Sequence, residues 1–187
     1  MRTIKIVSAF LLLAFVAINS FGQTEKVTEK KGKKPVKTEK SKVPAVVTET
    51  FVREYPTALY DNWYGYPAFA NESDWYGYNP YLYAEYPEYY VVEFTENAVP
   101  NKVIYSKGGK KIATHRKLNS PLPEKVTASI HSGEYKSWKL MNDKEEIFKD
   151  GDADNLKVYK VEVEKGTQKH ILLYLSDGKL LTDKKVA

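Results

Sequence analysis

Apolar positions recur at helical spacing in two short segments that resemble each other. The first, VPAVVTETFVREY, spans Val43–Tyr55, and the second, LPEKVTASIHSGEY, spans Leu122–Tyr135. In each segment two apolar residues lie four positions apart, Val47 with Phe51 and Val126 with Ile130, so each pair shares one face of a helix. The proline near each start is expected at the first helical position, where its missing N–H costs nothing.

Between and after these segments the hydrophobic pattern changes to alternation, which is typical of strands. YVVEF at Tyr90–Phe94 precedes YKVEV at Tyr159–Val163 by 69 residues, and VIYSKGGKKI at Val103–Ile112 precedes LLYLSDGKLL at Leu172–Leu181 by the same 69. KGGK and SDGK are hairpin turns in this interpretation, because Gly109 and Gly178 can adopt a positive φ. A constant offset over two separated blocks indicates an internal repeat.

Each repeat is therefore predicted to contain one helix followed by a meander of four antiparallel strands. The predicted fold is α+β: a tandem α-β-β-β-β repeat that forms one antiparallel sheet of about eight strands, with two helices packed on one face. The expected strands of the second repeat are Lys136–Asn142, Glu145–Lys149, Leu156–Glu164 and Gln168–Leu175, with a short edge at Lys179–Asp183. Helices on one side would leave the other sheet face open to a partner.

The stretch from 60 to 90 is unusually aromatic, with 13 of the 25 Phe, Trp and Tyr residues of the chain. It repeats itself, because DNWYGYP at Asp61–Pro67 returns as SDWYGYNP at Ser73–Pro80. From Tyr55 to Tyr90 the chain runs 35 residues, while the matching passage from Tyr135 to Tyr159 takes 24. The second repeat makes this passage without tyrosine enrichment, so the aromatic insert is not a requirement of the fold.

If WYGY is extended, Trp63 lies on one face of its strand while Tyr64 and Tyr66 lie on the other, and not all of these rings can enter a one-sided core. Exposed Tyr and Trp rings are effective contact anchors because they bury a large area with few rotatable bonds. Three roles remain open for the insert: packing on itself, binding a protein, or stacking on a glycan. The partner-binding residues predicted here are Trp63, Tyr64, Tyr66, Trp75, Tyr76, Tyr78, Tyr81 and Tyr83.

The N-terminus has the three parts of a secretory signal peptide: basic residues, the apolar run Ile6–Ile18 and the small-residue exit SFG. Residues 1–22 are predicted to be this signal and 23–42 a lysine-rich disordered leader, followed by the two repeats at 43–118 and 119–187. From Val43 onward 19 basic residues face 21 acidic ones, which argues against nucleic-acid binding. The chain contains no cysteine, so disulfides and thiol chemistry are excluded.

Catalytic and metal-binding motifs give no positive signal in the sequence. DGDADN at Asp150–Asn155 begins like a calcium loop, but Val161 stands where the pattern needs a bidentate glutamate. The three histidines, His115, His131 and His170, show no metal-ligand spacing. Glu93 and Glu162 occupy matching strand positions and are read as the polar side of alternating strands. We therefore predict no enzyme activity, metal or cofactor.

The order of these motifs, from VPAVVTETFVREYPTA through YYVVEF and VIYSKGGKKIATHRKL to LPEKVTASI and YLSDGKLL, resembles the PepSY-like, β-lactamase-inhibitor-protein-like domain family of bacterial envelope proteins. The resemblance covers about Val43 to Val186. It implies a secreted α–β–β–β–β tandem repeat without recognised catalytic residues, whose relatives bind and inhibit another protein through the exposed sheet face.

These observations predict a periplasmic or secreted, non-enzymatic binding protein. Its partner is expected to be a protein of the envelope or extracellular space, with inhibition of that protein as one outcome and no integral membrane segment after signal removal. The alternative is a carbohydrate-binding module that uses the same Tyr and Trp rings.

Overall fold

The computed structural model describes residues 28–29, 36–68, 75–76, 82–150 and 156–186. Two helices alternate with runs of strands, and a short 3-10 turn at Lys40–Lys42 precedes the first helix. The helices are α1 (Ala45–Glu54) and α2 (Glu124–Ser132). The strands are β1 (Thr28–Glu29), β2 (Leu59–Tyr66), β3 (Leu82–Tyr83), β4 (Tyr89–Glu96), β5 (Val99–Ser106), β6 (Lys111–Lys117), β7 (Lys139–Lys149), β8 (Lys157–Lys165), β9 (Gln168–Leu175) and β10 (Leu180–Val186).

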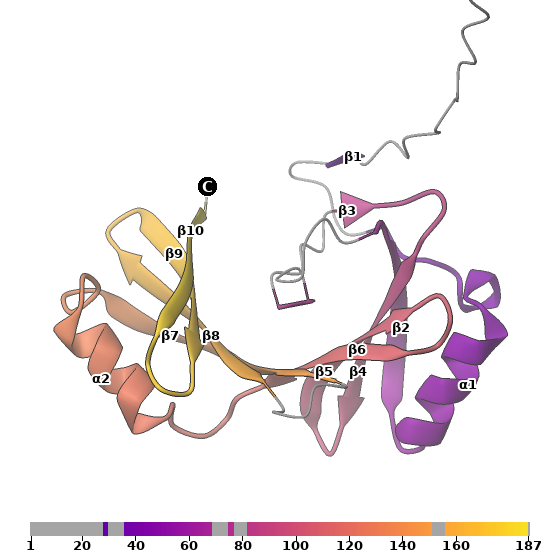
Figure 1. The fold of residues 1–187 in the computed structure, drawn as a ribbon, viewed down its shortest axis with the longest axis horizontal. Coiled ribbons are helices and arrows are strands. Elements are labelled where there is room, and N and C mark those ends of the chain that lie inside the picture. The colour runs from indigo at the N-terminus through magenta and orange to yellow at the C-terminus, as the bar shows by residue number, and fades with distance from the viewer. Residues whose placement is uncertain (1–27, 30–35, 69–74, 77–81, 151–155, 187) are drawn as a thin grey trace, which may run out of the picture.

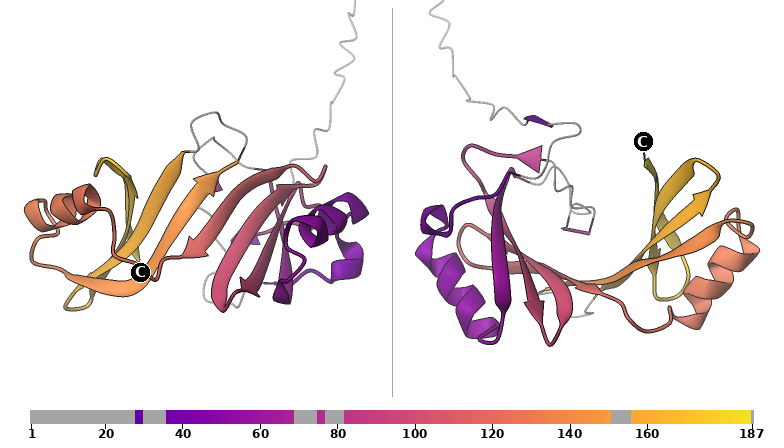
Figure 2. Two further views of the ribbon diagram at one scale, coloured as in Figure 1. Left: turned by 90° about the horizontal axis from the view of Figure 1, so that it is seen from below. Right: turned by 180° about the vertical axis from the view of Figure 1, so that it is seen from behind.

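One antiparallel sheet of eight strands dominates the molecule, in the order β10-β9-β8-β7-β6-β5-β4-β2. Each strand of this sheet lies next to the one that follows it in the sheet's chain order, so the topology is a continuous meander. The antiparallel sheet of eight strands and the two helices agree with the prediction. The sheet curves strongly, and α1 and α2 lie at its two ends on the outer side of the curve (Figure 1). Views from below and from behind show the same arrangement (Figure 2).

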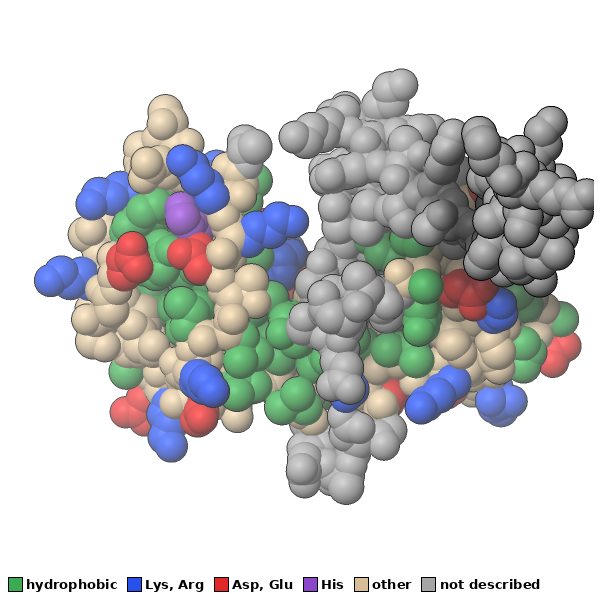
Figure 3. Space-filling model, turned by 45° about the horizontal axis from the view of Figure 1, so that its top comes forward, with side chains coloured by type: hydrophobic (Ala, Val, Ile, Leu, Met, Phe, Trp, Pro, Cys, Tyr) green, Lys and Arg blue, Asp and Glu red, His purple; other side chains and the backbone are tan. Residues whose placement is uncertain are grey.

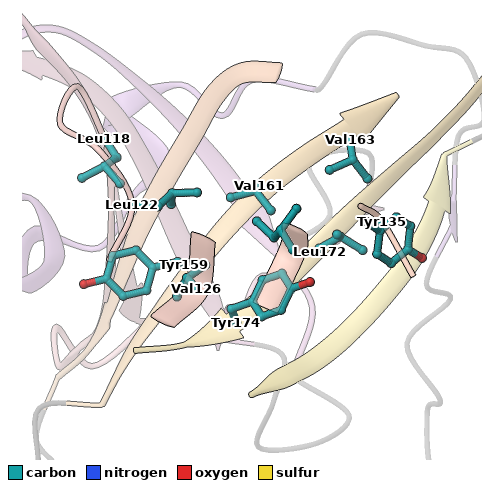
Figure 4. Packing of buried hydrophobic residues seen from close by; sticks show 10 residues of the cluster. Leu118, Leu122, Val126, Tyr135, Tyr159, Val161, Val163, Leu172 and Tyr174 are labelled. Carbon is teal, nitrogen blue, oxygen red and sulfur yellow. The ribbon is translucent and has the colours of Figure 1, made fainter. Parts of the chain in front are cut away.

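Each helix buries the face that its apolar spacing predicts. Val47 and Phe51 of α1 belong to a cluster with residues of β2, β4 and β5. Val126 and Ile130 of α2 belong to a second cluster with residues of β8 and β9 (Figure 4). Pro44 and Pro123 each stand one residue before the helix instead of at its first position, and the carbonyl of each accepts an early helical hydrogen bond.

The two predicted hairpin turns carry the backbone geometry that glycine favours. Gly109 has φ +81° and Gly178 has φ +89°. Both turns also touch a helix: a Cβ on Gly109 would lie 2.9 Å from Cγ2 of Val46, and one on Gly178 would lie 2.6 Å from the carbonyl oxygen of Lys125. Each contacted residue is the second of its helix, so each glycine allows a helix to lie directly against a hairpin.

Gly178→Ala is expected to cost more stability than the matched change Gly166→Ala. Gly166 has φ +62° and nothing within 4 Å of an added Cβ, so alanine there adds only about 1–2 kcal/mol of backbone strain. At Gly178 the same strain is joined by a clash with backbone, which adds about 1–3 kcal/mol. Urea unfolding of the two variants, followed by circular dichroism, measures the difference. Equal midpoints would contradict the contact between α2 and this turn.

Two sequence-based boundaries need correction. The strands expected at Lys136–Asn142 and Glu145–Lys149 are one strand, β7, whose pairing with β8 shifts between Leu140 and Lys144. Four residues of β7 there oppose two of β8, and this bulge lets the strand continue past its polar centre.

The lysine-rich leader is not disordered throughout, because its end lies along β2. The backbone N–H of Thr38 donates to the carbonyl of Trp63 at 2.7 Å, and Lys37 Nζ donates to Oδ1 of Asn62 at 2.6 Å. Lys40 forms an ion pair with Asp61. The predicted signal peptide at 1–22 lies outside the described residues. Among the helices that the structure describes, none is long and apolar enough to cross a membrane.

Candidate binding surface

The sheet face opposite the helices, here called the hollow face, lies on the inner side of the curve. Strand alternation sends to it Tyr64, Val91, Ile104 and Ala113, which are neighbours across β2, β4, β5 and β6. Ile147, Val158 and Leu173 continue this apolar cluster into the second half of the sheet. Hydrophobic side chains gather in the middle of the view toward this side, with Lys and Arg around them (Figure 3).

The hollow face is not bare, and in this respect the prediction of an open sheet face is wrong. Val91, Ile104, Ile147 and Val158 have no exposed surface, and Leu173 is 4% exposed. The curvature brings side chains of both halves toward each other, and residues outside the central strands pack against them. One of these residues is Trp75 of the aromatic insert, which belongs to the same cluster and is 4% exposed.

Trp75 is held on the hollow face by apolar packing and by one backbone contact. Nε2 of His115 lies 3.1 Å from the carbonyl oxygen of Trp75. Because a carbonyl can only accept, Nε2 of His115 carries the proton in this contact. The indole also packs edge-on against Tyr76, with ring centroids 4.8 Å apart. Both Trp75 and its contact on β6 are therefore specified together.

A polar row crosses the hollow face from β4 to β8 beside this contact. Its members are Glu93, Lys102, His115, Glu145 and Lys160, one from each of the five strands. Oε1 of Glu145 lies 3.5 Å from Nζ of Lys102 and 3.4 Å from Nζ of Lys160, and Oε2 lies 3.5 Å from Nδ1 of His115. Lys102 also lies 3.8 Å from Oε1 of Glu93. Glu145 is thus the common partner of three basic groups.

The electrostatics of the polar row keep Glu145 ionised. Burial alone would raise the pKa of this carboxyl, but the hydrogen bond with His115 and the charges of Lys102 and Lys160 outweigh it and hold the pKa well below its usual range. At one end of the row the hydroxyl of Tyr64 donates to Oε2 of Glu93 at 3.2 Å. Burial, together with the Glu93 charge, raises the pKa of Tyr64 to about 12.

The predicted contact residues do not lie together on one exposed surface. Trp63 is 3% exposed beneath α1, where its ring packs edge-on against Phe51 and its Nε1 donates to Asp61 at 3.0 Å. Tyr64 and Tyr66 are buried on the hollow face, as is Trp75, and Tyr76 is half-buried there. Tyr83 is part of β3, which pairs with β1. Tyr78 and Tyr81 lie outside the described residues.

Two other tyrosines of the aromatic stretch are strongly exposed, and sequence reasoning missed both. Tyr60 is 85% exposed and Tyr86 is 73% exposed. Tyr60 also has φ +58°, at a point where the pairing of β2 with β4 is irregular. Tyr86 stands in the polar turn sequence Ala84–Glu88, with charge and proline beside it, which was a usable signal for exposure. Both rings lie outside the two WYGY units that drew attention first.

A second polar cluster connects the end of α2 to the β9–β10 edge. The Tyr135 hydroxyl donates to Asp183, and Nδ1 of His170 lies 2.5 Å from Oδ1 of the same carboxylate. Burial acts against ionisation of Asp183, but the hydrogen bonds from Tyr135 and His170 hold the pKa of this carboxyl below its usual range. These groups satisfy one another. Among the residues that the structure describes, no three His, Cys, Asp or Glu side chains form a group that could hold a metal ion.

Comparisons with known proteins identify the fold. No family model matches the chain. No curated protein matches it. Similar solved structures include a DUF2874 family protein from Bacteroides uniformis, at 17% identity and a TM-score of 0.57, over 76% of this chain and 88% of that one. A BLIP-like protein from Bacteroides fragilis aligns at 20% identity and a TM-score of 0.54, over 76% and 86% of the two chains.

A third structure, from Bacteroides eggerthii and provisionally described as periplasmic, aligns at 15% identity with a TM-score of 0.57, over 76% of this chain and 88% of that one. At these identities the comparisons establish the fold alone. The chain therefore has the fold of the DUF2874 and BLIP-like structures, and its hollow face is the surface on which its own chemistry is concentrated.

Proposed function

We propose that this protein is a secreted or periplasmic, non-enzymatic binding protein that uses the hollow face to hold another protein of the envelope or extracellular space. The observation that carries the proposal is the polar row. Charged groups placed at the centre of a sheet face cost desolvation energy, and apolar residues there would serve stability as well or better. Their presence beside aromatic rings is typical of a surface selected for recognition.

The comparison structures support the same assignment. One structure of this fold is described as a BLIP-like protein and another, provisionally, as periplasmic. A location outside the cytoplasm also agrees with the predicted signal peptide at 1–22 and with the absence of cysteine. Inhibition of the bound protein is one form that this function would take.

We also infer that the sheet arose from two PepSY-like repeats, at 43–118 and 119–187. The two helix-side clusters use equivalent positions 69 residues apart, among them Tyr90 with Tyr159, Val92 with Val161 and Tyr105 with Tyr174. The hairpin glycines Gly109 and Gly178, again 69 residues apart, contact the second residue of their respective helices. Two such units joined through β6 and β7 would produce the curved sheet, and hence the hollow face.

Capture from an envelope extract tests the proposed function. The immobilised protein is expected to retain a defined protein, and Lys160→Gln or Tyr76→Ala is expected to reduce its affinity about tenfold or more, as loss of a central contact does. The matched control is Lys125→Gln, on the exposed side of α2. Equal loss with the control, or no loss with either hollow-face variant, would contradict binding through this face. Quenching of tryptophan fluorescence by soluble glycans, without protein capture, would favour the carbohydrate-binding alternative.

A further inference from the structure

We infer that Trp75 is a replaceable, self-supplied ligand of the hollow face, and that the site beneath it recognises a peptide segment that presents an indole next to a hydrogen-bond-accepting carbonyl. This inference rests on the proposed function and specifies how that surface is regulated. A partner of this chemistry would bind by taking the place of Trp75. The structure then represents the self-occupied state of the protein.

The first support is that Trp75 contributes to the hollow face without belonging to the sheet. Its indole is 4% exposed and lies in the cluster formed by residues of the central strands. The residue itself lies in a short turn, outside all eight strands of that sheet. Its backbone contact comes from His115, 40 residues away in sequence. A side chain held in this way can leave while the hydrogen bonds between strands stay intact.

The second support is that the helix-to-strand passage does not need the segment that carries Trp75. The equivalent passage in the second half, from Tyr135 to Tyr159, is 24 residues long, against 35 from Tyr55 to Tyr90. Both halves nevertheless complete a helix and four strands of the sheet. The additional length therefore serves the hollow face and not the construction of the sheet.

The third support is the chemistry of the place that Trp75 occupies. Its floor is apolar, with Val91, Ile104 and Ile147 fully buried in the same cluster. Its wall is His115, whose Nε2 donates to a carbonyl while Nδ1 faces Glu145 at 3.5 Å. Glu145 is fixed in turn by Lys102 and Lys160. A pre-oriented donor beside an apolar floor matches an aromatic residue within a peptide, and an aliphatic chain or a free sugar would leave the donor or the floor unused.

A peptide supplied in trans tests the inference. The probe is a labelled synthetic peptide of residues 73–80, SDWYGYNP, with blocked ends, and its affinity is measured by fluorescence anisotropy up to millimolar concentration. The folded full-length Trp75→Ala variant is expected to bind it at least about tenfold more tightly than the wild-type protein, because the site is vacated. The same peptide with Trp replaced by Ala should show no such preference. His115→Phe, added to Trp75→Ala, should remove most of the gain.

Equal or undetectable binding by the wild-type protein and a folded Trp75→Ala variant would overturn the inference. So would loss of the sheet signal in circular dichroism on Trp75→Ala, since that result would make the indole an obligatory part of the core. The capture assay separates this outcome from failure of the proposed function. Capture that is equal in the wild-type and Trp75→Ala proteins leaves the binding function standing and refutes self-occupancy, whereas peptide binding without any captured protein does the reverse.

Discussion

Trp63→Ala is expected to lower the free energy of unfolding by about 3–5 kcal/mol, the usual cost of removing a large buried aromatic ring. Trp63 packs between α1 and the sheet, edge-on to Phe51 with ring centroids 5.3 Å apart, and its Nε1 donates to Asp61. Its carbonyl also accepts the hydrogen bond from Thr38 of the leader. Loss of the ring therefore leaves a cavity at the point where helix, edge strand and leader meet.

Trp75→Ala is the matched comparison for this prediction, because the two indoles are almost equally buried, at 3% and 4% exposed. If Trp75 belongs to a segment that can detach locally, its replacement removes only the free energy of docking and costs distinctly less than Trp63→Ala. Urea unfolding monitored by far-ultraviolet circular dichroism measures both losses without depending on tryptophan emission. Equal losses would show that both rings are core residues, and a larger loss for Trp75→Ala would refute the distinction made here.

Glu145→Gln is expected to lower the free energy of unfolding at neutral pH by about 3 kcal/mol, the lower end of the cost of breaking a buried ion pair. The substitution preserves size but leaves Lys102, Lys160 and His115 without their common carboxylate. Because the lysines are 29% and 21% exposed, part of the cost is relieved by hydration, which argues against the upper end of the range. Glu164→Gln is the control, since its ion pair with Lys169 is near the surface and is worth about 0–1 kcal/mol.

The same carboxylate gives the protein a predictable sensitivity to acid. The pKa of Glu145 is lowered in the folded state from a reference value of 4.5, so its contribution to stability is fully present above about pH 4.5. That contribution is lost as the pH falls from there toward the depressed folded pKa. Unfolding midpoints measured between neutral pH and pH 3 should therefore fall more steeply for the wild-type protein than for Glu145→Gln. Parallel curves would contradict the assigned role of this carboxylate.

Regular features of the fold follow from the sequence because they depend on local spacing. The four-residue steps Val47–Phe51 and Val126–Ile130 predict which helical faces are buried, and alternation in Tyr90–Phe94 and Tyr159–Val163 predicts which strand side chains meet those helices. The positive φ angles of Gly109 and Gly178 follow from turn chemistry. The merged strand β7 was not predictable in the same way, because its bulge depends on the pairing with β8.

The candidate site depended on tertiary structure much more. Alternation correctly separated Trp63 from Tyr64 and Tyr66, but it could not say that the sheet curves enough to bury the second face as well. The polar row joins residues from Glu93 to Lys160, and only the register of five strands brings them together.

The sequence by itself determined the helices, most strands, the turns and the side on which each strand residue lies, since these are set by neighbours a few positions apart. Only the tertiary structure decided that one WYGY unit supplies a tryptophan to the helix side and the other to the hollow face. The two units are nearly identical as local sequence, so the difference between Trp63 and Trp75 has a long-range cause. Trp63 lies on a strand paired with β4, whereas Trp75 lies on a turn held by His115 of β6.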